Sequence, residues 1–269
     1  MSHAQLVALG GIAGATIFLG LPFGWLPARH ARTKTFLSAM STGVLVFLLV
    51  DILGHANEAL EHARSWSVGA LGVVYALGFG AGLLGLSYSG RLVAPRRQSQ
   101  GPGAMSVAEA LRPAVAATPR ALSLGMSIAV GIGLHNFSEG LAIGQTANAG
   151  ERSLAAVLVI GFALHNATEG FGIVAPLAAA NVRPRLGWLA LAGVVGGGPT
   201  LIGTVLGRVA TSPLLYVGCL ALAGGTILYV VGELLATGRR LNWSVTLWGV
   251  LAGLLVATAT DVLVTAGGA

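Results

Sequence analysis

Long apolar stretches, separated by short polar segments, run along the whole chain. Eight of them reach the roughly 20 residues that a helix needs to cross a bilayer. The pattern predicts an all-α integral membrane protein with eight transmembrane helices. It also predicts a single polytopic membrane domain over residues 1–269, without a separate soluble domain. The predicted spans are 5–26, 36–58, 67–89, 122–146, 153–178, 186–208, 213–236 and 243–266.

The polar segments between the spans indicate how the chain is oriented. Twelve of the 15 basic residues lie in the segments after the first, third, fifth and seventh spans. Basic loops stay on the cytoplasmic side, so we expect these four loops in the cytoplasm and both termini outside. The segment 90–121 is the only long one. Its prolines, glycines and arginines predict a cytoplasmic linker with a short helix at about 106–111.

Composition supports the membrane assignment and excludes other classes. Charged residues make up 9% of the chain, against about 25% in soluble proteins, and 41 glycines suit closely packed membrane helices. The net charge of +6 resides in the loops as a topology signal, so we expect no nucleic-acid partner. The one cysteine, Cys219, excludes an intramolecular disulfide and a cysteine-cluster metal site.

Ionisable residues inside a span are costly, and each is a candidate for function. The second span carries a stripe of acidic and histidine residues at helical spacings of four, three and four. We interpret the stripe as a cation-attracting entrance, although its last members are equally well explained as the solvated end of a helix. Its members are Asp51, His55, Glu58 and His62.

Three further features occur in the later spans, two acidic residues and a run of glycines that ends in proline. Glu233 is a candidate exit-side ligand, or else a partner for Arg239 or Arg240. Asp261 lies near the end of the last span, within easy reach of water, and we assign it no role. The run Gly196–Pro199 predicts a break in the sixth span, which either exposes backbone carbonyls or forms a packing kink.

The main chemical signal is a six-residue motif that occurs almost twice. His135-Asn136-Phe137-Ser138-Glu139-Gly140 in the fourth span is followed by His165-Asn166-Ala167-Thr168-Glu169-Gly170 in the fifth. Histidine and glutamate four residues apart share one helix face, and asparagine lies about 100° round from the histidine. Two such helices side by side predict a cation site at mid-membrane.

The donor types indicate which class of cation suits this site. Two facing glutamates in a low-dielectric interior repel each other, and a divalent cation removes that penalty. Imidazole nitrogen together with carboxylate oxygen suits Zn²⁺, and less selectively Fe²⁺, Mn²⁺, Co²⁺ or Cd²⁺. Ca²⁺ and Mg²⁺ prefer oxygen ligands alone.

Eight spans, external termini, a long loop after the third span and the paired motifs resemble the ZIP (Zrt-/Irt-like) metal transporters, in particular their prokaryotic, GufA-like branch. The resemblance implies a 3+2+3 arrangement of helices, with an inverted repeat of the outer triplets. It also implies an elevator-like, alternating-access uptake of Zn²⁺ and other divalent cations into the cytoplasm.

The same resemblance assigns roles within the motifs. The implied ligands are His135, Glu139, His165 and Glu169, the two glutamates bridging to a second metal position. Asn136 and Asn166 would serve that second position.

The chain also departs from the family pattern. Ser138 and Thr168 stand where the family commonly has proline, and Gly198 stands where it often has a glutamate ligand. A hydroxyl bonded to a carbonyl of the preceding turn can also bend a helix, as proline does. The missing carboxylate leaves us expecting one main metal site, with a weak second site open.

Two other functions compete with uptake. An intramembrane zinc hydrolase would use His135, His165 and Glu139 as ligands and Glu169 as the base, but hydrolytic sites usually divide roles between unlike residues. A divalent metal exporter would usually have six spans and a soluble domain. We therefore predict a transporter and not an enzyme, in the plasma (inner) membrane. Its predicted partners are metal ions, the lipid bilayer and a second copy of the chain in a homodimer.

Overall fold

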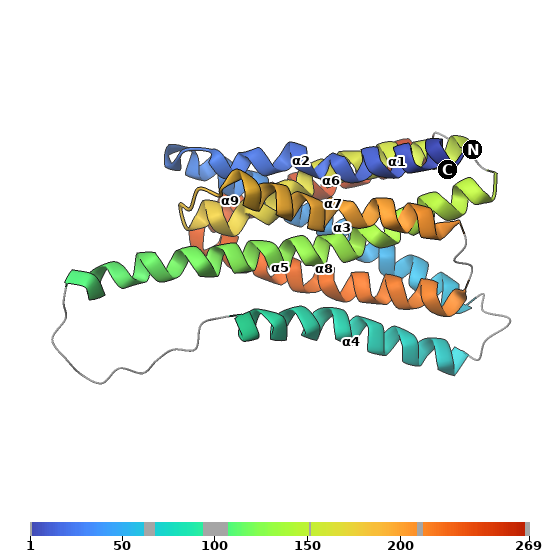
Figure 1. Cartoon of the computed structure of the whole chain (residues 1–269), viewed down its shortest axis with the longest axis horizontal. Helices are drawn as coiled ribbons and strands as arrows, with labels where there is room; N and C mark the ends of the chain where they lie inside the picture. The colour runs from blue at the N-terminus through green and yellow to red at the C-terminus, as the bar shows by residue number, and fades with distance from the viewer. Residues whose placement is uncertain (1, 62–67, 94–106, 151, 209–211, 267–269) are drawn as a thin grey trace.

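The chain forms a bundle of long helices in a computed structural model that describes residues 2–61, 68–93, 107–150, 152–208 and 212–266 (Figure 1). Within these residues the secondary structure is helical, with no strand. In chain order the helices are α1 (His3–Ala15), α2 (Ile17–Gly20), η1 (Leu21–Trp25), η2 (Ala28–His30), α3 (Ala31–Glu61), α4 (Val68–Val93), α5 (Val107–Asn148), α6 (Arg152–Ala179), α7 (Leu186–Gly207), α8 (Pro213–Leu241) and α9 (Trp243–Ala266).

Eight helical segments of the described chain are long and apolar enough to cross a membrane. The prediction of an all-α protein with eight membrane-spanning helices is therefore confirmed. The first segment is composite, because α1, α2 and η1 follow one another without a loop. The segments are His3–Trp25, Ala31–Glu61, Val68–Tyr88, Thr118–Asn148, Ser153–Ala179, Leu186–Gly207, Pro213–Leu241 and Trp243–Val262.

The structure differs from the sequence prediction in the segment after the third span. Residues 107–121, expected to belong to a loop with one short helix, form the first turns of α5, which runs unbroken from Val107 to Asn148. Alanine is abundant here, and it is the strongest helix former, which offsets the two prolines. Residues 94–106 of the predicted loop lie outside the described residues.

The predicted break in the sixth span is wrong. Helix α7 continues through Gly196–Pro199 with Pro199 inside it. The glycines instead allow close packing, because a Cβ atom on Gly197 would collide with the carbonyl of Gly14 in α1. A membrane helix tolerates proline and glycine where neighbouring helices cover the backbone.

Both ends of the chain lie at the same end of the bundle (Figure 1). There, Nη1 of Arg208 after α7 lies 3.4 Å from Nδ1 of His3 at the start of α1. At the opposite end, the indole nitrogen Nε1 of Trp25 donates to the carbonyl oxygen of Pro184 at 2.9 Å. The end of the first span is thereby joined to the segment that follows the fifth span.

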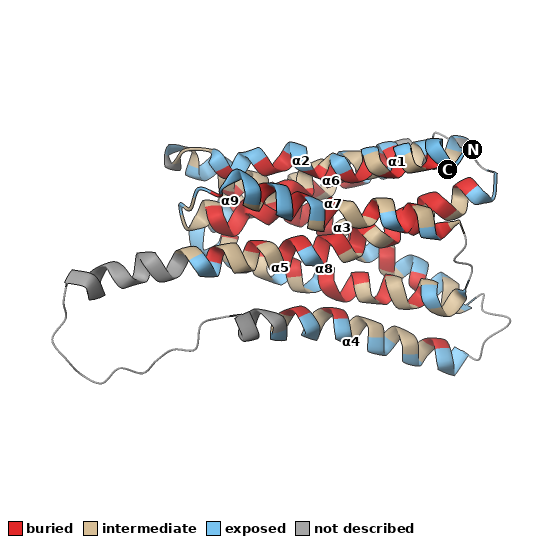
Figure 2. Ribbon diagram, viewed as in Figure 1, coloured by how far each residue is buried: buried red, intermediate tan, exposed pale blue. Residues whose placement is uncertain are grey.

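The helices divide into two groups by how they pack. In the first group, α5 packs on α7, α7 on α1, and α6 on α1 and α2; in the second, α3 packs on α9 and α4 on α8, with α3 also against α8. The groups meet mainly where α3 contacts α6 and where α8 contacts α5. Buried residues concentrate in these central helices, whereas α4 has little buried surface (Figure 2).

Candidate functional site

The first copy of the motif lies near the middle of the membrane-spanning part of α5, Thr118–Asn148, and both of its ionisable side chains are buried. His135 and Glu139 are one helical turn apart, and Nε2 of His135 lies 2.9 Å from Oε1 of Glu139. Apolar residues of α5 in the preceding turns, such as Ile128 and Ile132, are also buried and hold this part of the helix inside the bundle. The side chains of His135 and Glu139 therefore lie in a packed part of the bundle.

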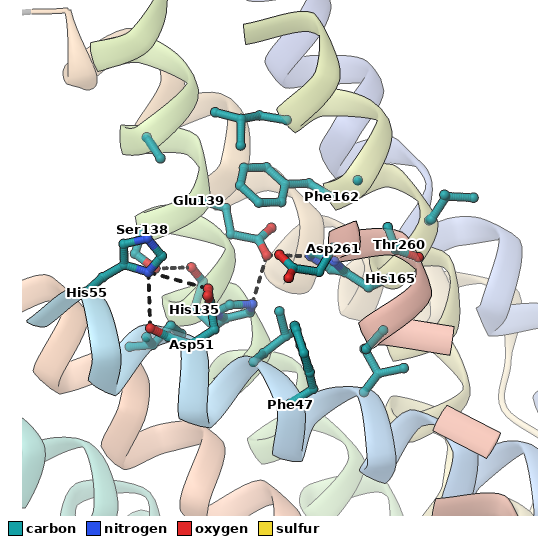
Figure 3. Close-up of a pocket in the computed structure, with 18 of the residues that line it drawn as sticks. Phe47, Asp51, His55, His135, Ser138, Glu139, Phe162, His165, Thr260 and Asp261 are labelled. Atoms are coloured by element: carbon teal, nitrogen blue, oxygen red, sulfur yellow. Dashed lines mark hydrogen bonds and ion pairs between the residues drawn. The ribbon is translucent and has the colours of Figure 1, made fainter. Parts of the chain in front are cut away.

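The second copy, on α6, faces the first. Nε2 of His165 lies 2.5 Å from the same oxygen, Oε1 of Glu139. Glu139 thus connects both histidines, and the side chains of Glu139 and His165 point towards each other (Figure 3). One ligand atom from each of His135, Glu139 and His165 lies within 4.8 Å of the others, close enough for one ion to reach all three.

Glu169 is placed deeper than its counterpart Glu139. It is fully buried, and its Oε1 lies 3.9 Å from Nε2 of His135. It does not line the cavity that reaches the other three residues. The two glutamates are therefore unequal in position, although their motifs are near copies.

The two asparagines of the motifs are fully buried and bind backbone carbonyls of other helices. Nδ2 of Asn136 donates to the carbonyl oxygen of Gly196 in α7 at 3.0 Å. Nδ2 of Asn166 donates to the carbonyl oxygen of Ala13 in α1 at 3.1 Å. Their predicted role as metal ligands would use the opposite atom of each amide, Oδ1.

Hydroxyl groups support both histidines from within their own helices. Oγ of Ser138 donates to the carbonyl oxygen of His135 at 2.6 Å, and Oγ1 of Thr168 donates to that of His165 at 2.7 Å. These residues occupy the places where a proline would remove a backbone N–H donor. Both α5 and α6 remain continuous helices here.

The site concentrates buried polar atoms that lack a hydrogen bond. Among the described residues, ten buried side-chain nitrogen or oxygen atoms have no hydrogen-bond partner, and seven belong to the two motifs. Leaving such an atom unpaired costs about 1–3 kcal/mol, so a concentration of them indicates a ligand site. Nitrogen and carboxylate oxygen together fit a Zn²⁺-like cation. The seven atoms are His135 Nδ1 and Nε2, Asn136 Oδ1, Glu139 Oε2, Asn166 Oδ1, and Glu169 Oε1 and Oε2; of these, His135 Nε2 and Glu169 Oε1 make the ion-pair contacts described above.

A cavity of about 410 Å³ connects this cluster to the surface of the bundle. His135, Glu139 and His165 line its deep part, and exposed residues of α3 and α9 line its mouth. In the mouth, Nδ1 of His55 lies 3.5 Å from Oδ2 of Asp51, and the side chains are 53% and 42% exposed respectively. Two predicted entrance residues therefore border the same space as the buried cluster.

The other predicted entrance and exit residues lie elsewhere. Glu58 is exposed and does not line the cavity. His62 lies outside the described residues. Glu233 is half-buried on α8, away from the cavity, and its carbonyl oxygen accepts a hydrogen bond from Oγ1 of Thr237 at 2.9 Å.

Sequence reasoning missed two groups of cavity residues. Thr260 and Asp261 of α9 line the cavity mouth, so the absence of a role assigned to Asp261 needs correction. The signal was present, since Asp261 is an acidic residue within a predicted span. Phe162 on α6 also lines the cavity, with its ring centroid 5.5 Å from that of His165. An aromatic residue in an apolar span offers no comparable signal.

Comparison with known proteins gives two similarities. The family model described as "ZIP Zinc transporter" matches residues 104–261, a stretch that contains both motifs. The chain is also similar to the "Zinc transporter ZupT" of Corynebacterium glutamicum, at 32% identity over 259 residues. That match covers 90% of this chain and 95% of the relative.

Proposed function

The chain belongs to the ZIP zinc transporter family, and from this premise we propose that it carries Zn²⁺ across the membrane into the cytoplasm by alternating access. Family membership places it among transporters and not enzymes. The proposed substrate ligands are His135, Glu139, His165 and Glu169. Fe²⁺, Mn²⁺, Co²⁺ and Cd²⁺ are proposed as further substrates, because the same donor types accept them.

The observation that carries this proposal is the set of unpaired buried atoms in the two motifs. A divalent cation would accept lone pairs from imidazole and carboxylate together, which no single protein donor group in an apolar interior can do. All-cysteine sites hold zinc more firmly, whereas a His/Glu set is suited to reversible binding. Reversible binding is what a carrier requires.

Access to the cluster is one-sided, which supports alternating access. On α5, all cavity-lining residues lie at or after His135, towards the end near the chain termini. On α6, which runs in the opposite direction, all lie at or before His165. The cavity therefore extends from the cluster towards one end of the bundle only. By the distribution of basic residues, we propose that this end faces outward.

An apolar layer closes the other side of the cluster. On α5 the preceding turns contain the buried Ile128 and Ile132, and on α6 the following turn contains the buried Ile173 and Val174. These residues belong to one core cluster with Val230 and neighbouring residues of α8. A hydrated cation cannot pass such a layer, so release towards the cytoplasm requires helices to move apart.

The packing of the two helix groups supports an elevator-like movement between them. Within a group, helix backbones touch: a Cβ atom on Gly140 of α5 would collide with the Thr200 backbone of α7, and one on Gly253 of α9 with the Met40 backbone of α3. Between the groups, the atom nearest to a Cβ atom built at Gly172 of α6 belongs to a side chain, the hydroxyl oxygen of Ser41 in α3. Close backbone contacts would keep each group rigid, whereas the side-chain contacts between the groups would allow one group to slide past the other.

The metal path proposed at either side of the site uses the predicted polar residues. An entering cation would first meet Glu58 and His62, and Asp51 and His55 would then pass it from the outer mouth towards the cluster. Glu233 would receive it on the cytoplasmic side. The exposure of Asp51 and His55 within the same cavity supports the outer part of this path.

The remaining features of the proposal concern the whole chain. We propose one polytopic domain over 1–269 with a 3+2+3 arrangement and an inverted repeat of the outer triplets. Helix contacts support that repeat, because each has a counterpart on the other side. The contact of α3 with α9 corresponds to that of α8 with α4, and the contact of α5 with α7 corresponds to that of α6 with α1. We also propose a location in the plasma (inner) membrane, external termini and a homodimer.

Zinc uptake into proteoliposomes tests the function. Wild-type protein should accumulate ⁶⁵Zn²⁺, and Glu139→Gln should abolish the accumulation because the substituted amide keeps its size and loses its charge. Glu61→Gln, at an exposed position of α3 that does not line the cavity, is the matched control and should transport normally. Equal flux through wild type and Glu139→Gln would refute the proposed site. Flux only from the basic-loop side outward would support the exporter instead.

A further inference from the structure

Each motif presents two separate faces. Histidine and glutamate occupy positions one and five, and asparagine and glycine occupy positions two and six, so both pairs have the spacing of one helical turn. On α5 the cavity is lined by His135 and Glu139 but not by Asn136 or Gly140. The asparagine and glycine therefore lie on a face that the cavity does not reach.

In the first copy this second face packs against α7. Nδ2 of Asn136 donates to the carbonyl oxygen of Gly196. One turn further along α5, Gly140 lies against the carbonyl oxygen of Thr200, four residues after Gly196. A Cβ atom at position 140 would also lie 2.8 Å from the Thr204 nitrogen, so only glycine fits this contact.

In the second copy the same arrangement recurs against α1 and α2. Nδ2 of Asn166 donates to the carbonyl oxygen of Ala13. One turn later, Gly170 lies against the carbonyl oxygen of Ile17, again four residues after the first acceptor. A Cβ atom at position 170 would lie 2.7 Å from the Cα atom of Gly20. Two different partner helices thus make the same contacts.

We propose that Asn136 with Gly140, and Asn166 with Gly170, are positioning residues that dock each metal-binding helix onto a neighbouring helix of its own group. This inference rests on the proposed function for the identity of the ligand. The docking sets the rotation of α5 and α6 about their axes. That rotation directs His135, Glu139, His165 and Glu169 towards one another.

The role differs from direct metal binding, because it depends on the nitrogen of each amide and not on its oxygen. Aspartate at position 136 or 166 would keep an oxygen for a cation. It would place that oxygen against a backbone carbonyl oxygen, where two acceptors repel. Alanine would remove both groups. Docking therefore predicts that aspartate is no better than alanine, and metal binding through Oδ1 predicts that aspartate is far better.

The test compares Asn136→Asp and Asn136→Ala with wild type by zinc titration calorimetry of purified, folded protein. Docking predicts that both variants bind Zn²⁺ at least about tenfold more weakly, the usual effect of removing a group that orients a ligand. Asn166→Asp and Asn166→Ala should behave in the same way. Gly11→Ala, at a position of α1 with no atom within 4 Å of the added Cβ, is the control and should bind normally.

Hydrogen–deuterium exchange of the zinc-free protein provides a second readout, which remains decisive if the wild type binds no zinc. Asn136→Ala should speed exchange in α7 around 196–204, and Asn166→Ala in α1 and α2 around 13–20. Wild-type-like exchange would overturn the docking role, as would an aspartate variant that binds zinc as tightly as wild type. Faster exchange with unchanged zinc affinity in folded protein would also overturn it, because the contact would then be structural only.

Discussion

The side chains around the site fall into three sets with different partners. Histidine and glutamate contact one another, with Glu139 between His135 and His165. Asparagine nitrogens bind the backbones of neighbouring helices. Acidic residues at the mouth, Asp51 on α3 and Asp261 on α9, border the same cavity from two neighbouring helices. The first set would bind the metal directly, the second would affect metal binding through helix placement, and the third would attract the cation to the cavity.

Removing the negative charges at the cavity mouth should change how zinc is captured and not how fast the bound ion is transported. We expect Asp51→Asn and Asp261→Asn each to raise the KM for zinc uptake about threefold to tenfold at low ionic strength, because fewer cations are drawn to the cavity. The maximal rate should stay close to wild type. Uptake kinetics at low and high salt measure this, since salt screens charges that lie near solvent. A fall in maximal rate with unchanged KM would contradict the assignment.

The spacing of residues made part of this site predictable. Histidine and glutamate four apart share a helix face whatever surrounds the helix, so the chemical stripe can be read from the sequence. The role of Asn136 depends on α7 lying beside α5, and a spacing rule does not contain that fact. An acidic residue near the end of a span, such as Asp261, either reaches water or serves the site, and only the position of α9 beside the cavity distinguishes the two.

Close backbone contacts determine how the helices pair. Gly43 of α3 lies against the carbonyl oxygen of Val250 in α9, and Gly253 of α9 lies against that of Met40 in α3. Gly82 of α4 and Gly225 of α8 make the corresponding contacts with each other's helices. Small residues at these crossings let the helices approach, which is how membrane helices gain packing energy.

Two glycines on the same helix should respond oppositely to alanine. Gly43→Ala forces a methyl group into the α9 backbone and should destabilise the protein by about 1–3 kcal/mol. Gly54→Ala places its methyl group where no atom lies within 4 Å, and should be neutral or stabilise by up to about 1 kcal/mol through helix propensity. Thermal unfolding in detergent measures both. Equal effects of the two substitutions would show that α3 and α9 do not meet as described.

The helices themselves were largely predictable, because length and hydropathy suffice to identify a span. The two errors have a common cause. Proline and glycine usually interrupt helices in water, and they predicted a loop at 107–121 and a break at Gly196–Pro199. In the structure both segments are helical. In α7, packing against close neighbours such as Gly14 compensates the weak helix propensity of the glycines. The sequence alone does not show which residues will be neighbours in space.

At the scale of the whole molecule, two groups of helices enclose a site that opens towards one end. The first group contains both motifs, and α3 and α8 of the second group contact it through α6 and α5. Which helices form each group could not be predicted from hydropathy, because every span satisfies the same length rule. The pairing is encoded in the positions of individual glycines, whose partners are known only once the helices are placed.

A cross-link between the groups should stop transport. The Cβ atom of Ser41 lies 3.7 Å from a Cβ atom built at Gly172, which suits a disulfide. In a Cys219→Ser background, oxidised Ser41→Cys/Gly172→Cys should lose zinc uptake, and reduction should restore it. Gly78→Cys/Ala221→Cys, at 3.2 Å within the second group, is the control and should transport while cross-linked. Normal uptake by the cross-linked first pair would rule out movement between the groups.

The central claim is that the doubled motif binds the transported metal. An experimental structure of the zinc-soaked protein, with anomalous data collected on both sides of the zinc absorption edge, tests it most directly. The claim predicts a zinc peak between α5 and α6, about 2.0–2.2 Å from nitrogen or oxygen atoms of His135, Glu139 and His165. A zinc peak at Asp51 or Asp261 alone, with none between the two motifs, would contradict it.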